Sequence, residues 1–146
     1  MRGGFVHNRV LVDRLDAAFR AVGAKTLLEC PTGPGTPRGF VDILATMDGV
    51  RIVCEVELRA NRVELAVRKA VALDADYLLL VTPNGRTARA IRARLARADA
   101  LPGVEMPPEF ILTLGQALQW VTSCFPLLTA TNGPSPAKER SSCRAR

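Results

Sequence analysis

Three carboxylates stand in two short apolar runs near the middle of the chain. Asp42 lies in GFVDIL, and Glu55 and Glu57 lie in VCEVEL. Sites built only from carboxylate oxygens suit Mg²⁺ or Mn²⁺ rather than zinc. We therefore treat Asp42, Glu55 and Glu57 as candidate ligands of a divalent metal ion.

A predicted β-hairpin brings these acids together. Residues 40–47 and 50–58 read as strands, and Asp48-Gly49 between them is a strong signal for a two-residue turn. Such a turn pairs Met47 with Val50 and, further along, Asp42 with Glu55, whose Cβ atoms should lie about 5 Å apart. One face of the hairpin is then wholly apolar, with the pairs Val41/Val56, Ile43/Cys54 and Ala45/Ile52. The other face carries Phe40/Glu57, Asp42/Glu55 and Leu44/Val53.

Opposed carboxylates repel each other, so the hairpin needs a cation, a nearby basic side chain or a raised pKa. The acids could instead lie on a solvated edge face and only keep the hairpin soluble. Their neighbours on that face, Phe40, Leu44 and Val53, are apolar. This apolar setting favours the metal site.

The rest of the chain predicts alternating helices and strands. Leu11 to Val22 has the apolar spacing of a helix, and Lys25 to Cys30 reads as a short strand. The later elements are a helix over 61–73, a strand over 76–81, a helix over 85–99, a strand over 110–114 and a helix over 116–124 that ends before Pro126. The order α-β-β-β-α-β-α-β-α predicts one α/β domain over residues 1–130, in two or three layers, with a mixed central sheet flanked by helices.

An amphipathic helix, GFVDIL, a hairpin, VCEVEL, a helix and the strand DYLLLVTPN follow one another between about Val6 and Asp99. This order resembles the core of the PD-(D/E)xK, or restriction-endonuclease-like, nuclease superfamily. The resemblance implies that core fold, α-β-β-β-α-β, with Mg²⁺ or Mn²⁺ held by Asp42 and Glu55. The third motif position, usually Lys, is Glu57, an ExE version known among some restriction enzymes of the family. Val41 stands where the motif has Pro.

The resemblance further implies a metal-dependent nuclease that hydrolyses DNA phosphodiester bonds in repair, recombination or defence, acting as a homodimer. Glu57 would bind a second metal or orient the attacking water. Some relatives supply the missing Lys from the next helix, where Lys69 is the candidate and Arg62 shares its face, although Lys69 could simply be solvated. Asp16 on the first helix is a weak candidate for an auxiliary acid.

Several basic and amide side chains are candidates for contact with nucleic acid. Asn61 and Arg62 begin a helix beside the acidic motif, although Asn61 could simply cap that helix. Arg86 and Arg89, with Arg94 and Arg97, form the polar arc of the helix over 85–99. They could follow a DNA backbone, or they could be an ordinary solvated face.

Two other functions remain open. A nuclease-like protein without catalysis would bind nucleic acid or a protein partner on the same scaffold, and ExE would mark its lost activity. An α/β enzyme acting on phosphorylated metabolites is less favoured, because no GxGxxG or GxxxxGK loop follows a strand.

Charge and cysteine usage limit the partners and the compartment. The net charge of +6 favours polyanionic partners, and half of it lies in the segment 131–146, which we expect to be a disordered basic tail. The four cysteines are widely spaced and the only histidine is His7, so zinc is not expected. Cys54 is expected to be a small buried hydrophobe in a reducing compartment. No secretion signal or membrane span is evident, which predicts a cytoplasmic protein.

Overall fold

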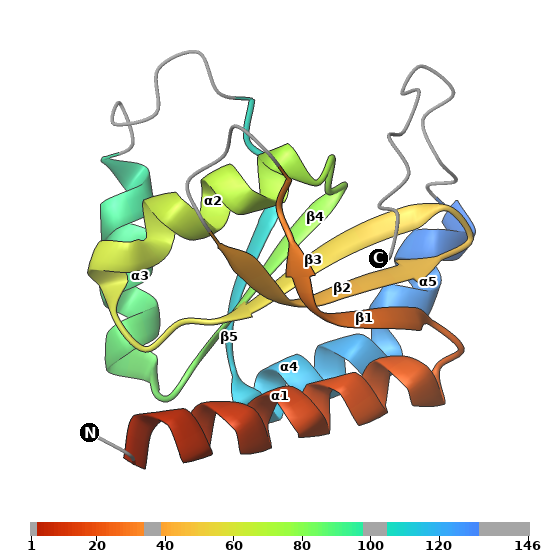
Figure 1. Cartoon of the computed structure of the whole chain (residues 1–146), viewed down its shortest axis with the longest axis horizontal. Helices are drawn as coiled ribbons and strands as arrows, with labels where there is room; N and C mark the ends of the chain where they lie inside the picture. Colours follow the sequence, from red (N-terminus) through yellow and green to blue (C-terminus); the bar gives the residue numbers. More distant parts are fainter. Residues whose placement is uncertain (1–2, 34–38, 98–104, 132–146) are drawn as a thin grey trace.

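The computed structural model describes residues 3–33, 39–97 and 105–131 (Figure 1). Within these ranges the chain forms an α/β fold with one five-stranded sheet. The strands are β1 (Lys25–Pro31), β2 (Phe40–Met47), β3 (Val50–Val56), β4 (Tyr77–Thr82) and β5 (Glu109–Thr113). The helices are α1 (Gly3–Ala21), the short 3₁₀ helix η1 (Ala60–Arg62), α2 (Val63–Ala72), α3 (Gly85–Ala96), α4 (Leu114–Ser123) and α5 (Phe125–Thr131).

The sheet is mixed, as predicted, and its strands lie in sequence order from β1 to β5. β1, β2 and β3 are joined by antiparallel pairing, whereas β3, β4 and β5 are parallel to one another. The parallel half requires crossover helices, which α2 and α3 supply. β3 lies at the centre and every one of its residues is buried. Glu55 therefore lies near the end of the most buried strand, with Glu57 directly beyond that end and Asp42 on the neighbouring strand β2.

Helices cover both faces of the sheet, which makes three layers (Figure 1). On one face the apolar sides of α2 and α3 pack against Leu44, Val53, Leu78 and Leu80. On the other face, residues of α1, α4 and α5 pack against Ile43, Ile52 and Leu79. The buried residues of α2 are the four that the helical spacing predicts, Val63, Ala66, Val67 and Ala70. The burial of both faces accounts for the nearly continuous apolar sequence of β3 and β4.

The β2–β3 hairpin has the predicted register. Asp48 and Gly49 both have positive φ, as a two-residue type I′ turn requires. Met47 pairs with Val50, and the ladder continues in the same register to Ile43 and Cys54. Leu44 and Val53 share one face, as expected. The turn therefore sets the register as far as Ile43 and Cys54, the residues directly before Asp42 and Glu55 along the hairpin.

One face assignment is wrong. Val41 was expected beside Val56, but Val41 packs with Leu44 on the α2 face, whereas Val56 packs with Ile43 on the α1 face. The strand alternation thus slips by one residue at Asp42. The β1–β2 pairing is interrupted at the same level, where Glu29 has a φ of +48°. A strained residue of this kind marks a local irregularity in the sheet, and here it adjoins the acidic motif.

Some element ends also differ from the predictions. β3 ends at Val56 rather than at Leu58, and the predicted helix over 61–73 is divided into η1 and α2. The predicted last helix is followed by a further one, α5, with Pro126 in its first turn, where a missing N–H costs nothing. Residues 98–99 of the expected third helix and, beyond Thr131, the predicted basic tail lie outside the described residues. No helix in the described ranges has the length and apolar character needed to cross a membrane.

Candidate active site

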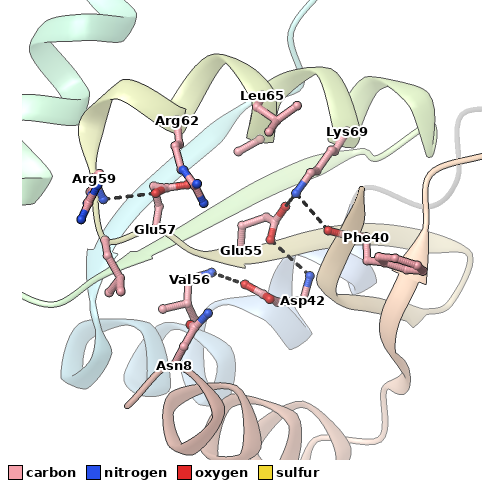
Figure 2. Close-up of a pocket in the computed structure, with 12 residues that line it drawn as sticks. Asn8, Phe40, Asp42, Glu55, Val56, Glu57, Arg59, Arg62, Leu65 and Lys69 are labelled. Carbon is pink, nitrogen blue, oxygen red and sulfur yellow. Dashed lines mark hydrogen bonds and ion pairs between the residues drawn. The ribbon is translucent and has the colours of Figure 1, made fainter. Parts of the chain in front are cut away.

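A pocket of about 480 Å³ opens where the ends of β2 and β3 meet α2 (Figure 2). The acids of the motif line it together with basic residues from the segment after β3 and from α2. Its charged lining residues are Asp42, Glu55, Glu57, Arg59, Arg62 and Lys69. The sheet and the following helix therefore bring the predicted acids and two of the predicted basic residues into one cavity.

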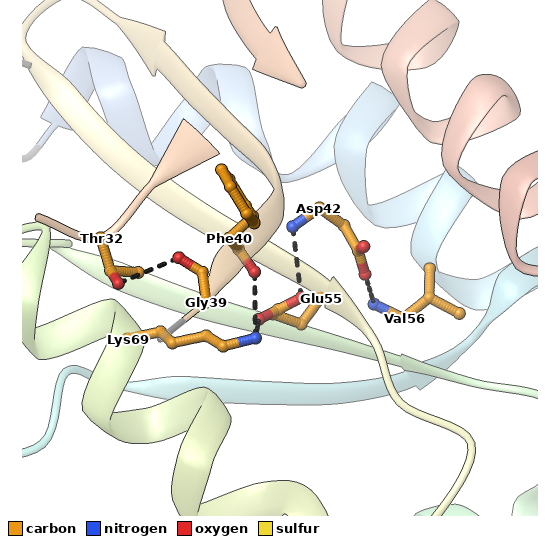
Figure 3. Close-up of polar contacts among 7 residues, drawn as sticks. All are labelled: Thr32, Gly39, Phe40, Asp42, Glu55, Val56 and Lys69. Atoms are coloured by element: carbon orange, nitrogen blue, oxygen red, sulfur yellow. Dashed lines mark hydrogen bonds and ion pairs between the residues drawn. The ribbon is translucent and has the colours of Figure 1, made fainter. Parts of the chain in front are cut away.

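Asp42 and Glu55 are held by each other's strand (Figure 3). The Asp42 backbone N–H donates to Glu55 Oε2 at 3.2 Å, and the Val56 N–H donates to Asp42 Oδ2 at 2.8 Å. These bonds lie just beyond the last regular pair of the ladder, Ile43 and Cys54. In a continuous hairpin the Val56 N–H would pair with Val41, whereas here the Asp42 carboxylate accepts it, and the Glu55 carboxylate accepts the Asp42 N–H. This arrangement fixes both side chains at the strand ends.

Lys69 reaches the acidic pair from α2. Its Nζ lies 3.0 Å from Glu55 Oε1 and donates a second hydrogen bond, also of 3.0 Å, to the carbonyl oxygen of Phe40. Only 15% of the Lys69 side chain is exposed, so the alternative of a solvated lysine does not hold. Lys69 lies between the buried residues Ala66 and Ala70, whose small side chains leave room for the helix to approach the sheet. The ammonium group is therefore a fixed part of the site.

Burial makes the negative charges in the pocket costly. It raises the pKa of Glu55 to about 8; the charge of Asp42 adds to the rise and Lys69 opposes it. The pKa of Glu57 is also raised, chiefly by burial. Only 8% of the Glu55 side chain is exposed, so Glu55 does not belong to a solvated edge face. Arg59 and Arg62 lie near Glu57, and Lys69 supplies one positive charge to the Asp42–Glu55 pair. When both acids of that pair are ionised they carry one negative charge more than Lys69 offsets, which a bound cation would stabilise.

The donor atoms fit a hard divalent cation in part. Asp42 and Glu55 supply adjacent carboxylates, whereas Glu57 Oε1 is turned to accept the Arg59 N–H at 3.1 Å. Within the described parts of the chain, no three side chains of His, Cys, Asp or Glu are arranged to hold a metal ion. Mg²⁺ often takes only one or two protein carboxylates and completes its shell with water and substrate phosphate. Asp42 and Glu55 meet that requirement. Glu57 lines the same pocket, but its carboxylate is directed toward the Arg59 N–H and not toward the other two acids.

The candidates for nucleic-acid contact are not all at the pocket. Arg62 lines the pocket and is exposed, but Asn61 does not line it. Neither η1 nor α2 has a side-chain cap at its start, so Asn61 does not cap a helix either. Arg86 and Arg89 are exposed on α3 and do not line the pocket.

Other charged groups are used in structural contacts. On α3, Arg94 pairs with Glu64, and Arg97 Nε donates to the carbonyl oxygen of Ala93. Asp16 accepts hydrogen bonds from Arg20 and from the Thr26 hydroxyl, which ties α1 to the start of β1. That engagement accounts for Asp16 without a role as an auxiliary acid.

Several lining residues were not among the predicted site residues: Asn8, Phe40, Leu58, Arg59 and Leu65. Phe40 and Arg59 stand close to the acidic runs, so their place in the chain was a usable signal. Asn8 comes from α1, far away in the sequence, and no spacing rule connects it with the hairpin. Its Oδ1 is buried and has no hydrogen-bond partner within the described residues.

No family model matches the chain, and no curated protein matches its sequence. The function is therefore inferred from the residues of the pocket and their geometry.

Proposed function

We propose that the chain is a metal-dependent nuclease of the PD-(D/E)xK type that hydrolyses DNA phosphodiester bonds with Mg²⁺ or Mn²⁺. One observation carries the proposal: Asp42 and Glu55 from two strands meet Lys69 from the next helix, with Lys69 Nζ 3.0 Å from Glu55 Oε1. Lys69 takes the part of the motif lysine, whose strand position is occupied by Glu57. The order of elements from α1 to β4 supports a restriction-endonuclease-like fold.

The residues of the pocket have distinct roles in this proposal. Asp42 and Glu55 hold the ion, which when bound neutralises the attacked phosphate and lowers the pKa of a water. Lys69, fixed by Glu55 and by the carbonyl oxygen of Phe40, presents its positive charge where negative charge develops during attack. Arg59 and Arg62 are exposed at the same pocket and bind the flanking phosphates.

The test is cleavage of labelled DNAs in the presence of Mg²⁺, Mn²⁺ or EDTA. The panel contains a single strand, a duplex, a nicked duplex, a branched DNA and a supercoiled plasmid. We expect metal-dependent cleavage that Asp42→Asn, Glu55→Gln and Lys69→Met each reduce by at least about 100-fold. Glu109→Gln, at an exposed glutamate of β5, is the matched control and should cleave like the wild type.

Cleavage that persists in EDTA, or in the Asp42 and Glu55 variants, would contradict the proposal. Absence of cleavage on every DNA with both metals would also contradict it. If DNA still binds in that case, with a salt-dependent affinity that Asp42→Ala leaves unchanged, the protein is a nuclease-like binding protein without catalysis.

A further inference from the structure

Phe40 is an exposed aromatic side chain at the rim of the acidic pocket. It is 61% exposed, whereas the other aromatic side chains that the structure describes are buried or half-buried. Within the described residues its ring packs against no other aromatic ring. Single exposed apolar residues are common on protein surfaces, so the argument depends on where this one lies.

The backbone of Phe40 is part of the site. Its carbonyl oxygen accepts the hydrogen bond from Lys69 Nζ, and its position in β2 is set by pairing with Pro31 (Figure 3). Asp42 follows two residues later, about 7 Å along the strand. The backbone of Phe40 is therefore held beside the acids by the same lysine that contacts Glu55.

Two arginines lie at the other end of the pocket, next to Glu57. Figure 2 shows Arg59 and Arg62 on the far side of the acids from Phe40. Both arginines are exposed and both line the pocket. A DNA strand that crosses the acids with its phosphates at the arginines brings the next nucleotide to the ring of Phe40.

We propose that Phe40 stacks against a DNA base next to the attacked phosphate, so that the site selects DNA that is unpaired there: a single strand or a frayed end. In a duplex each base face is covered by its neighbours, and the ring finds no free face. In a single strand the faces are accessible, and stacking on an aromatic side chain is largely independent of sequence. This inference rests on the proposed function and specifies its substrate.

The first measurement is DNA binding in EDTA, which removes the divalent metal that the proposed cleavage requires. Fluorescence anisotropy compares a labelled single strand with a duplex of the same sequence. We expect Phe40→Ala to weaken single-strand binding by at least about 5-fold and to change duplex binding by less than about 2-fold. Phe40→Trp should bind like the wild type. Leu127→Ala, which removes another large exposed apolar side chain away from the pocket, is the matched control.

The second measurement identifies the base that contacts the ring. Single bases are removed one at a time from the oligonucleotide, and each abasic strand is bound to the wild type and to Phe40→Ala. At one position we expect base removal to weaken wild-type binding by at least about 5-fold and to leave Phe40→Ala unaffected. Such coupling cannot arise if the substitution only disturbs the fold.

Each outcome decides the inference. If Phe40→Ala binds both DNAs like the wild type, weakens both equally or shows no coupling to any base, stacking is overturned, even where metal-dependent cleavage is observed. If the coupling is found and no DNA is cleaved, stacking stands and the nuclease proposal fails. If the wild type binds neither DNA in EDTA, stacking is overturned, and the nuclease proposal is decided by the cleavage assay alone.

Discussion

Glu55 uses both oxygens of its carboxylate, one toward Lys69 and one toward the backbone of Asp42. It is nearly enclosed, and burial raises its pKa to about 8. Near neutral pH the side chain therefore carries a proton in the metal-free protein. A cation that binds there has to displace that proton, so its affinity should rise with pH.

The raised pKa of Glu55 predicts how stability depends on pH. The unfolded chain loses this proton near pH 4.5, whereas the folded chain keeps it to about pH 8. Between these values the folded state binds more protons, so the free energy of unfolding should fall as the pH rises. In metal-free urea unfolding, we expect Glu55→Gln to gain about 3–4 kcal/mol relative to the wild type between pH 5 and pH 8.

Glu109→Gln is the control for this measurement, because Glu109 is exposed. Its stability should follow that of the wild type across the whole pH range. Parallel curves for Glu55→Gln and the wild type would refute a shifted pKa at Glu55. Burial also raises the pKa of Glu57, so Glu57 likewise makes the free energy of unfolding fall as the pH rises. That part of the pH dependence remains in Glu55→Gln.

At the residue scale, the sequence predicts the acids better than it predicts their partners. A two-residue turn sets the register of the hairpin up to Ile43 and Cys54, which brings the next residues, Asp42 and Glu55, to the same level. The contact of Lys69 depends on how closely α2 packs on the sheet and on which rotamer a long side chain adopts, and neither follows from local spacing. Asn8 reaches the pocket only because α1 crosses beneath the strands, which is a property of the tertiary fold.

At the scale of elements, local chemistry marks some boundaries clearly and others not at all. Asn84 directly precedes α3 and its side chain accepts the Thr87 N–H at 2.9 Å, as an N-cap does. Asn61 has the same side chain near the start of α2 and caps nothing. The irregular step at Asp42 and Glu29 leaves no sign in the alternation of the sequence, because it depends on the pairing of three strands.

The two asparagines provide a matched test of helix capping. We expect Asn84→Ala to lower the free energy of unfolding by about 1 kcal/mol, because the Thr87 N–H loses its acceptor. Asn84→Asp should retain most of the stability. Asn61→Ala should change it by less than about 0.5 kcal/mol, since its side chain makes no capping bond. Equal losses in the two alanine variants, measured by urea unfolding, would contradict the assignment of the cap.

At the scale of the whole molecule, the layer beneath the sheet is closed by α5. Phe125 is fully buried, with its ring 5.4 Å from that of Phe19 on α1 and 5.9 Å from that of Trp120 on α4. The sequence suggested that the last helix ends before Pro126, because proline usually terminates a helix. Here proline opens a new helix, which brings Phe125 into the core. The predicted order of strands and helices from α1 to α4 is otherwise confirmed.

The packing of Phe125 predicts that this last helix stabilises the fold. We expect Phe125→Ala to lower the free energy of unfolding by about 3–5 kcal/mol, because it leaves a cavity between α1 and α4. Leu127→Ala, two residues further along the same helix and 66% exposed, should change it by less than about 0.5 kcal/mol. Thermal unfolding of the two variants provides the comparison. Similar melting temperatures would show that α5 does not contribute to the core.

The irregular residue in β1 also affects how the sheet meets other molecules. β1 is an edge strand, and Leu27 and Leu28 are exposed along it. A long, flat, apolar edge strand is a template on which further chains add as strands and aggregate. Glu29 interrupts the edge with a charged, exposed side chain and a left-handed backbone. The same kink that adjoins the acids of the pocket therefore shortens the stretch of edge on which a second chain can pair, and so protects the protein against fibre-like association.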